Sequence, residues 1–124
     1  MARGSMAERL PGVFIQYLPE QPVARIFINP VLYALADKPQ RVLIVNNRER
    51  AECRLMGVDT LPGFEGQETA RAGFVVYASK GVQHIDISKQ MAQAWSLTEG
   101  HHLAWAVEGE QELGFLHSII DMGR

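Results

Sequence analysis

The sequence predicts a mainly β domain with short helices, in which two ββαββ repeats share one core. Three observations support this fold class. Short apolar and β-branched runs alternate with turn residues along the chain. Two polar residues each precede a short apolar helix. Residues of similar type also recur at a fixed spacing, because Tyr77 lies 60 residues after Tyr17 and Ile85 lies 59 residues after Ile26.

The first repeat spans residues 12–58. Its helix is expected over 31–36, because Asn29 can cap the free amides and Pro30 suits the first helical position, where no N–H is needed. Pro39 ends this helix, since a residue before proline avoids the helical conformation. Strands are expected on both sides of the helix, at 13–18, 23–28, 41–45 and 51–58.

The second repeat spans residues 73–120 and follows the same order. Lys80-Gly81 predicts a tight turn between its first two strands. Ser88 is the expected cap of a helix over 89–95, whose apolar residues fall at helical spacing. Its strands are expected at 74–77, 82–87, 102–107 and 113–120, with a turn at 108–110.

The remaining segments connect or flank the repeats. Residues 59–72 contain two glycines and one proline and are interpreted as a linker. Residues 1–11 and 121–124 are expected to be tails, and the Gly-Ser pair within residues 1–5 is typical of a cloning remnant. Because each repeat alone would expose one apolar face of a small sheet, we expect the two to pack as an intramolecular pseudo-dimer. The alternative is an unrelated β-rich barrel whose strands match at this spacing by chance.

Composition limits the functional classes. The chain has 124 residues, of which 47% are hydrophobic and 21% charged, as is typical of one soluble globular domain. No apolar run approaches the roughly 20 residues that a membrane helix needs. No secretory leader is seen, so we expect a cytoplasmic protein without a membrane partner. The single cysteine, Cys53, excludes an internal disulfide.

Charge is distributed unevenly along the chain. The net charge is −2, but residues 1–62 carry eight basic and six acidic residues, whereas residues 63–124 carry four basic and eight acidic ones. DNA-binding domains are usually basic as a whole. Any contact with DNA must therefore come from one half of the chain or from a local stripe.

The stretch from Ile87 to His101 resembles the core motif of the AbrB/MazE family of swapped-hairpin DNA-binding domains. That motif typically reads Ile-Pro-Lys, two residues, Arg, two residues, Leu, one residue, Leu, two residues, Gly-Asp. The residues that match it without a gap are Ile87, Lys89, Leu97 and Gly100, and Leu103 fits the apolar position that follows. The resemblance is weaker in the first repeat, where the matching residues are Ile26, Ile28 and Asn29-Pro30.

Two such units in one chain are similar to the arrangement of the MraZ family. The resemblance implies an AbrB-like barrel in which a single chain supplies both halves of what is normally a dimer. It also implies double-stranded DNA as the partner and a role as a transcriptional regulator or antitoxin. Three positions depart from the motif, because Ser88 replaces Pro, Ala92 replaces Arg and His101 replaces Asp. The family's DNA-contacting arginine therefore cannot be placed at position 92.

If the chain binds DNA, cations on strands and loops must meet the phosphates. Arg48 and Arg50 flank Glu49 at an expected hairpin tip, where their guanidinium groups can reach phosphates or guanine edges. The alternative is a solvated hairpin whose arginines serve solubility and weak ion pairs. The full candidate set is Arg25, Arg41, Asn46, Asn47, Arg48, Arg50, Arg54, Lys80 and Lys89.

No catalytic, cofactor or metal site is expected. Adjacent His101 and His102 point to opposite faces of a strand and cannot share a metal, although His84 and His102 could approach each other across neighbouring strands. Arg54 could lower the pKa of the Cys53 thiol. Without a nucleophile signature, however, a buried and inert thiol is the simpler interpretation.

We therefore expect a DNA-binding regulator or antitoxin-like protein without enzymatic activity. The alternative is a protein-interaction or inhibitor module of the same fold that has lost DNA binding. Such a module would bind a protein partner through the acidic second repeat, where residues 108–112 carry three glutamates. An enzyme or small-molecule sensor would be indicated only by a deep polar pocket. A homo-oligomer is a further option, because the repeats can exchange strands between chains.

Overall fold

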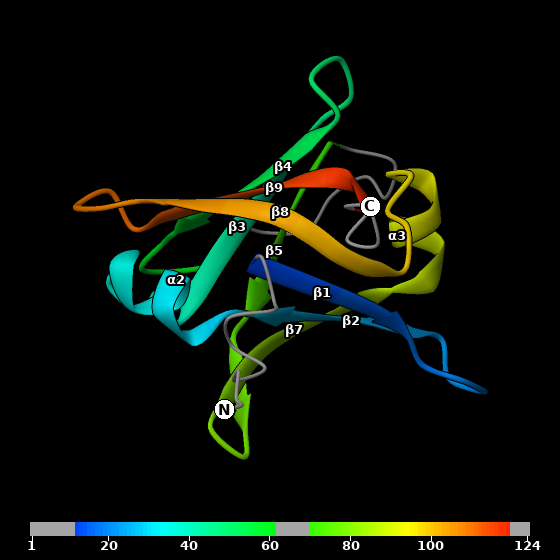
Figure 1. Ribbon diagram of the computed structural model, residues 1–124, viewed down its shortest axis with the longest axis horizontal. Coiled ribbons are helices and arrows are strands. Elements are labelled where there is room, and N and C mark those ends of the chain that lie inside the picture. Colours follow the sequence, from blue (N-terminus) through cyan, green and yellow to red (C-terminus); the bar gives the residue numbers. More distant parts are fainter. Residues whose placement is uncertain (1–11, 62–69, 120–124) are drawn as a thin grey trace, which may run out of the picture.

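The computed structural model describes residues 12–61 and 70–119, which form nine strands and two short helices. The strands make a nearly closed, antiparallel, barrel-like sheet, and the helices lie on opposite sides of it in Figure 1. No helix in this part of the chain is long and apolar enough to cross a lipid bilayer. The elements are β1 (Gly12–Tyr17), β2 (Val23–Ile28), α2 (Pro30–Leu35), β3 (Arg41–Asn47), β4 (Glu52–Gly57), β5 (Arg71–Val75), β6 (Tyr77–Ser79), β7 (Val82–Ser88), α3 (Lys89–Ala94), β8 (Gly100–Val107) and β9 (Glu112–Ile119).

Hydrogen bonds join the strands in the order β5-β3-β4-β9-β8-β1-β2-β7-β6. The two ends of this order belong to one stretch of chain, because only Val76 separates β5 from β6. β5 pairs with β3 whereas β6 pairs with β7, so this stretch nearly closes the barrel. The strand expected at 74–77 is thus longer, interrupted once, and begins inside the expected linker. Residues 62–69 of that linker lie outside the described residues.

The strand order is symmetric between the two sequence repeats. If β5 and β6 are counted as one strand and the order is read as a ring, exchanging corresponding strands gives the same ring in the reverse direction. Hairpin β1–β2 pairs with β8 and β7, and hairpin β3–β4 pairs with β5 and β9. Two cross-strand pairs join equivalent positions, because Ile26 lies opposite Ile85 and Arg54 lies opposite Gly114. The turns after β3 and β8 also match, since Ala51 and Gln111 both adopt left-handed φ values, of 55° and 53°.

The core lies inside the barrel and receives side chains from both halves of the chain. Alternate strand residues face inward, as in β2, where Ala24, Ile26 and Ile28 are buried and the residues between them are half-buried. Among the described residues, Phe115 of β9 is the largest fully buried side chain, and Tyr33 of α2 joins the same cluster. Because one cluster serves both halves, we infer that they fold as one cooperative unit.

The two predicted helix starts are confirmed. The side-chain oxygen of Asn29 accepts the Val31 N–H at 2.7 Å, and Pro30 occupies the first helical position. The Ser88 hydroxyl oxygen accepts the Met91 N–H at 3.0 Å. Both helices end one residue earlier than expected, because the chain turns into the left-handed conformation two residues after each helix.

A side chain at Gly114 should destabilise the barrel. A Cβ atom added there would lie 2.3 Å from Cζ2 of Trp105, which covers the glycine from the neighbouring strand. We expect Gly114→Ala to lower the free energy of unfolding by about 1–3 kcal/mol, the usual cost of overpacking. Urea unfolding measures this change. Adding Trp105→Leu should recover part of the loss, and equal costs with and without the ring would contradict the explanation.

Candidate nucleic-acid interface

The β3–β4 hairpin projects from the barrel and ends in a tight turn (Figure 1, green tip). The Asn47 side-chain oxygen accepts the backbone N–H of Arg50 at 3.0 Å, and the backbone N–H of Ala51 donates to the Arg48 carbonyl at 3.3 Å. At its base, the backbone N–H of His117 donates to the Ala51 carbonyl at 2.9 Å. The backbone of the tip is thus held by hydrogen bonds, while the side chains of Asn47, Arg48 and Arg50 are exposed.

Arg48 and Arg50 form no ion pair with any residue of 12–61 or 70–119. Only Glu49 stands between them, so the tip keeps one net positive charge. An unpaired guanidinium group retains its full fork of N–H donors, which matches a phosphate or a guanine edge. Among the candidates from the sequence, these two arginines are therefore best placed to contact a polyanion.

Two other candidate arginines are already neutralised. Arg25 binds Asp86 across the β2–β7 pair with both ends of its fork, at 2.8 Å from Nε to Oδ1 and 3.1 Å from Nη2 to Oδ2. Arg54 lies 3.2 Å from carboxylate oxygens of both Glu52 and Glu112. Because carboxylates already compensate the charges of Arg25 and Arg54, we correct the sequence-based set by excluding these two arginines as phosphate contacts.

Asn46 must be excluded as well, because the pleat of β3 turns it into the barrel, where it is buried. Its side-chain oxygen accepts from Nε2 of His117 at 2.5 Å and from the Cys53 thiol at 3.5 Å. Burial, followed by the charge of Glu52, raises the pKa of the Cys53 thiol to about 12. The expectation that Arg54 lowers this pKa is therefore wrong, and the thiol is inert at neutral pH.

The remaining candidate cations lie apart from the tip. Arg41 is exposed at the first residue of β3, about 20 Å along the strand from its last residue at the usual rise of an extended chain. Lys80 is exposed in the β6–β7 turn, with a left-handed φ of 54°. Lys89 is half-buried at the first residue of α3. The nine candidates from the sequence therefore do not form a single basic stripe.

The β8–β9 hairpin ends in a turn of opposite charge. Its exposed Glu108 and Glu110 stand 60 residues after Arg48 and Arg50, at equivalent places in the turn. Because β4 and β9 are antiparallel neighbours, the two turns lie at opposite ends of this strand pair (Figure 1, green and orange tips). The barrel thus carries a basic tip, residues 48–50, and an acidic tip, residues 108–110.

A row of rings crosses the outer face of five strands, and sequence reasoning did not identify it. The ring centroids of His101 and Phe14 are 4.8 Å apart, those of Phe14 and Phe27 6.2 Å, those of Phe27 and His84 5.9 Å, and those of His84 and Tyr77 5.8 Å. Each pair lies directly opposite in the strand register. Burial lowers the pKa of His84, with a smaller contribution from Arg25, so its ring is disposed to stay neutral.

The expected approach of His84 to His102 is wrong. β1 and β2 separate their strands in the sheet, and His84 belongs to the outer row whereas His102 is fully buried. The ring nitrogens of His102 lie 2.5 Å and 2.7 Å from the carbonyl oxygens of Leu116 and Thr98. In the described part of the chain, no three or more His, Cys, Asp or Glu side chains gather in a way that could hold a metal ion.

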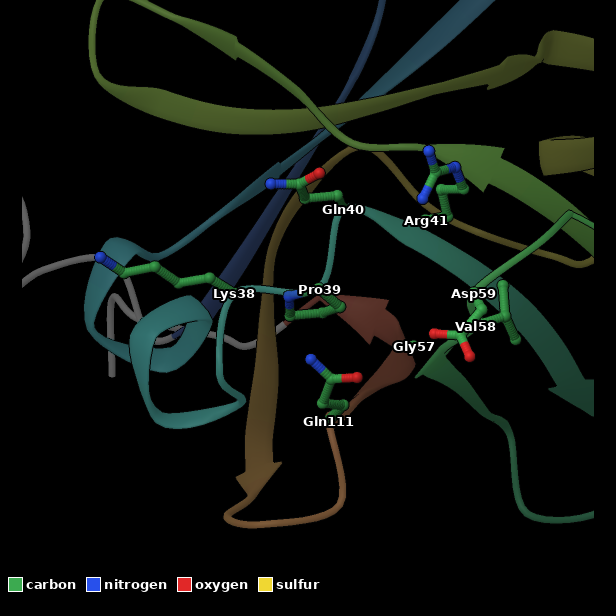
Figure 2. Close-up of a pocket in the computed structure, with 8 residues that line it drawn as sticks. All are labelled: Lys38, Pro39, Gln40, Arg41, Gly57, Val58, Asp59 and Gln111. Atoms are coloured by element: carbon green, nitrogen blue, oxygen red, sulfur yellow. The ribbon is translucent and has the colours of Figure 1, made fainter.

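Two adjoining hollows share Gln40 and Arg41 at the start of β3. The hollow in Figure 2 has a volume of about 250 Å³. There the Lys38 side chain extends away from the other side chains, and the Arg41 guanidinium group points away from Asp59. Its charged groups do not converge, so we assign no ligand to it. The second hollow has a volume of about 360 Å³, and Arg41 lines it together with residues 75–78.

The chain matches no family model, no curated protein and no solved structure.

Proposed function

We propose that the chain is a DNA-binding protein with a regulator or antitoxin-like role, which contacts duplex DNA through its basic tip. The observation that supports this proposal is the pair of exposed, unpaired arginines, Arg48 and Arg50, on a projecting two-stranded hairpin. A two-stranded ribbon fits the major groove of B-DNA, which is about 12 Å wide. The side-chain NH2 group of the exposed Asn47, whose oxygen holds the turn, adds a donor that can reach an acceptor on a base edge.

We further propose that the barrel is a tandem AbrB-like swapped-hairpin fold, with the first repeat at 12–58 and the second at 73–120. Three observations support it: the strand order is symmetric under exchange of the repeats, Ile26 faces its counterpart Ile85, and both helices begin with a capping residue at the same place. A single chain then contains both halves of the family's usual dimer, and the halves differ in charge.

The charge distribution indicates that binding is modest in strength and restricted to one orientation. Only two arginines lie free at the basic tip, the acidic tip repels phosphate, and the whole chain has a net charge of −2. Affinity for DNA grows with the number of phosphates neutralised. A contact made by two arginines therefore depends on base edges as well as phosphates for useful affinity.

Fluorescence anisotropy of a labelled mixed-sequence duplex, titrated with protein at several salt concentrations, tests the proposal. Two phosphate contacts predict that the logarithm of the binding constant falls with the logarithm of salt with a slope of about −2. An absence of binding at about 50 mM salt, or binding that is indifferent to salt, would overturn the proposal.

A second candidate function is binding of a basic protein partner through the acidic tip. The exposed Glu108 and Glu110 on a projecting turn favour it, because such a turn can reach into a positively charged groove. An affinity pull-down that recovers one stoichiometric protein without nucleic acid would support this function. Loss of that partner from the variant Glu108→Arg/Glu110→Arg would assign the contact to the acidic tip.

A further inference from the structure

The barrel has an open seam where the chain passes from β5 to β6. Among the described strands, residues 71–75 pair with β3 alone, and residues 77–79 pair with β7 alone. The corresponding first strand of the other repeat is held differently, because β1 pairs with β2 over residues 13–17 and with β8 over residues 12–15. β3 and β7 therefore diverge at Val76, and a hollow of about 360 Å³ lies between them. Its volume falls within the range of small-molecule sites.

The walls of this hollow combine a ring, amides and a cation. Tyr77 is 53% exposed and ends the row of rings, so one face of its ring is available to a ligand. Gln40 and Gln83 bring side-chain amides, which both donate and accept hydrogen bonds. Tyr33 forms part of the floor and is fixed there, because its hydroxyl donates to the Pro39 carbonyl at 2.6 Å.

Arg41 supplies the positive charge at the rim. It is exposed and forms no ion pair with the residues in 12–61 and 70–119. Its backbone is held in β3 opposite Val75, which places its guanidinium group beside the end of β5 (Figure 2). Asp59 lies on the far side of Arg41, in the other hollow, so that side is unsuited to a second negative charge.

From this combination we propose that the seam binds a nucleoside monophosphate, either free or as an unpaired nucleotide of a nucleic acid. The base stacks on Tyr77, its polar edge meets the amides of Gln40 and Gln83, and the phosphate pairs with Arg41. Base stacking on an exposed aromatic ring tolerates any base, whereas a guanidinium fork selects the phosphate. A single available cation favours one phosphate over a chain of three.

Nucleotide binding at the seam is independent of the proposed contact between the basic tip and DNA. A nucleotide seated in the seam lies about 20 Å along β3 from the basic tip, so the two ligands do not compete for the same side chains. The charge-reversed variant Arg48→Glu/Arg50→Glu should therefore keep its affinity for the nucleotide. Failure of the DNA proposal would leave this inference untouched, and the reverse also holds.

Titration of the ¹⁵N-labelled protein with adenosine 5′-monophosphate, followed by amide chemical shifts, tests the proposal. We expect sub-millimolar affinity, with shifts confined to the start of β3, β6 and the neighbouring part of β7. Adenosine and inorganic phosphate, each alone, should bind at least tenfold more weakly than the nucleotide. Equal binding of inorganic phosphate, or shifts that map elsewhere on the barrel, would overturn the assignment.

Variants separate the contributions and control for folding. Arg41→Gln and Tyr77→Leu should each weaken binding about tenfold or more, the effect of losing one good contact, whereas Tyr77→Phe keeps the ring and should bind like the unchanged protein. Lys80→Gln removes a nearby cation that does not line the hollow and should have no effect.

A duplex carrying one unpaired adenosine distinguishes a free nucleotide from a nucleotide within a nucleic acid. Binding of this duplex alone, lost in Arg41→Gln, identifies the nucleotide as part of a nucleic acid, and no response to either probe overturns the proposal.

Discussion

Reversing both charges at the basic tip, in the variant Arg48→Glu/Arg50→Glu, is expected to weaken binding to duplex DNA about 100-fold. An arginine that binds a guanine edge contributes about 1–3 kcal/mol, and about 1.4 kcal/mol corresponds to a factor of ten. The two glutamates that the variant introduces also repel the phosphates. Anisotropy titrations of the variant and the unchanged protein at low salt measure the difference.

The chain offers a matched control at equivalent positions on its other end. Glu108→Gln/Glu110→Gln neutralises two charges in a turn of similar form. Because it removes negative charge, we expect equal or slightly stronger DNA binding. If Arg48→Glu/Arg50→Glu and Glu108→Gln/Glu110→Gln alter the affinity for DNA in the same direction, DNA does not approach through the basic tip.

Truncating Phe115, the largest fully buried side chain of the described residues, should strongly destabilise the barrel. Phe115 is 0% exposed and packs in the cluster shared by both halves of the chain, next to the ring of fully buried His102. We expect Phe115→Ala to lower the free energy of unfolding by about 3–5 kcal/mol, a large part of the stability of a domain this size. Urea unfolding followed by tryptophan fluorescence and by far-ultraviolet circular dichroism measures the loss.

The two optical signals should remain coincident, because one core joins the two halves. Leu103 is a suitable control, since it is 48% exposed on β8 and its replacement by alanine should change stability by less than about 0.5 kcal/mol. Separate transitions, one retained and one lost in Phe115→Ala, would show instead that the halves fold independently.

Local chemistry made much of the fold predictable. A helix start depends on the residue that caps it, so Asn29 and Ser88 indicated both helices from the sequence alone. The Lys80-Gly81 turn was equally local, because it needs backbone conformations that glycine adopts readily. The break at Val76 was not predictable in this way. It arises because one strand changes neighbours, and neither neighbour is close to it in sequence.

The candidate site was less predictable, because residues far apart in sequence decide which cations are free. Asp86 stands 61 residues after Arg25, and Glu112 stands 58 residues after Arg54, so their ion pairs become visible only in the folded barrel. The burial of Asn46, in contrast, had a signal in the sequence. Asn46 lies two and four residues after Ile44 and Val42, which are both buried. Because side chains alternate between the two faces of a strand, all three lie on the inner face.

The unlike tips have a consequence for how the molecule meets a polyanion. Positive charge at one tip and negative charge at the other contribute an electric dipole directed between the two tips. In the field of a nucleic acid such a dipole rotates before collision, so that the arginine extremity arrives first. If one copy of the chain binds DNA as we propose, it presents its arginine tip once and suits a target without internal symmetry, whereas a homodimer presents the same face twice and suits an inverted repeat.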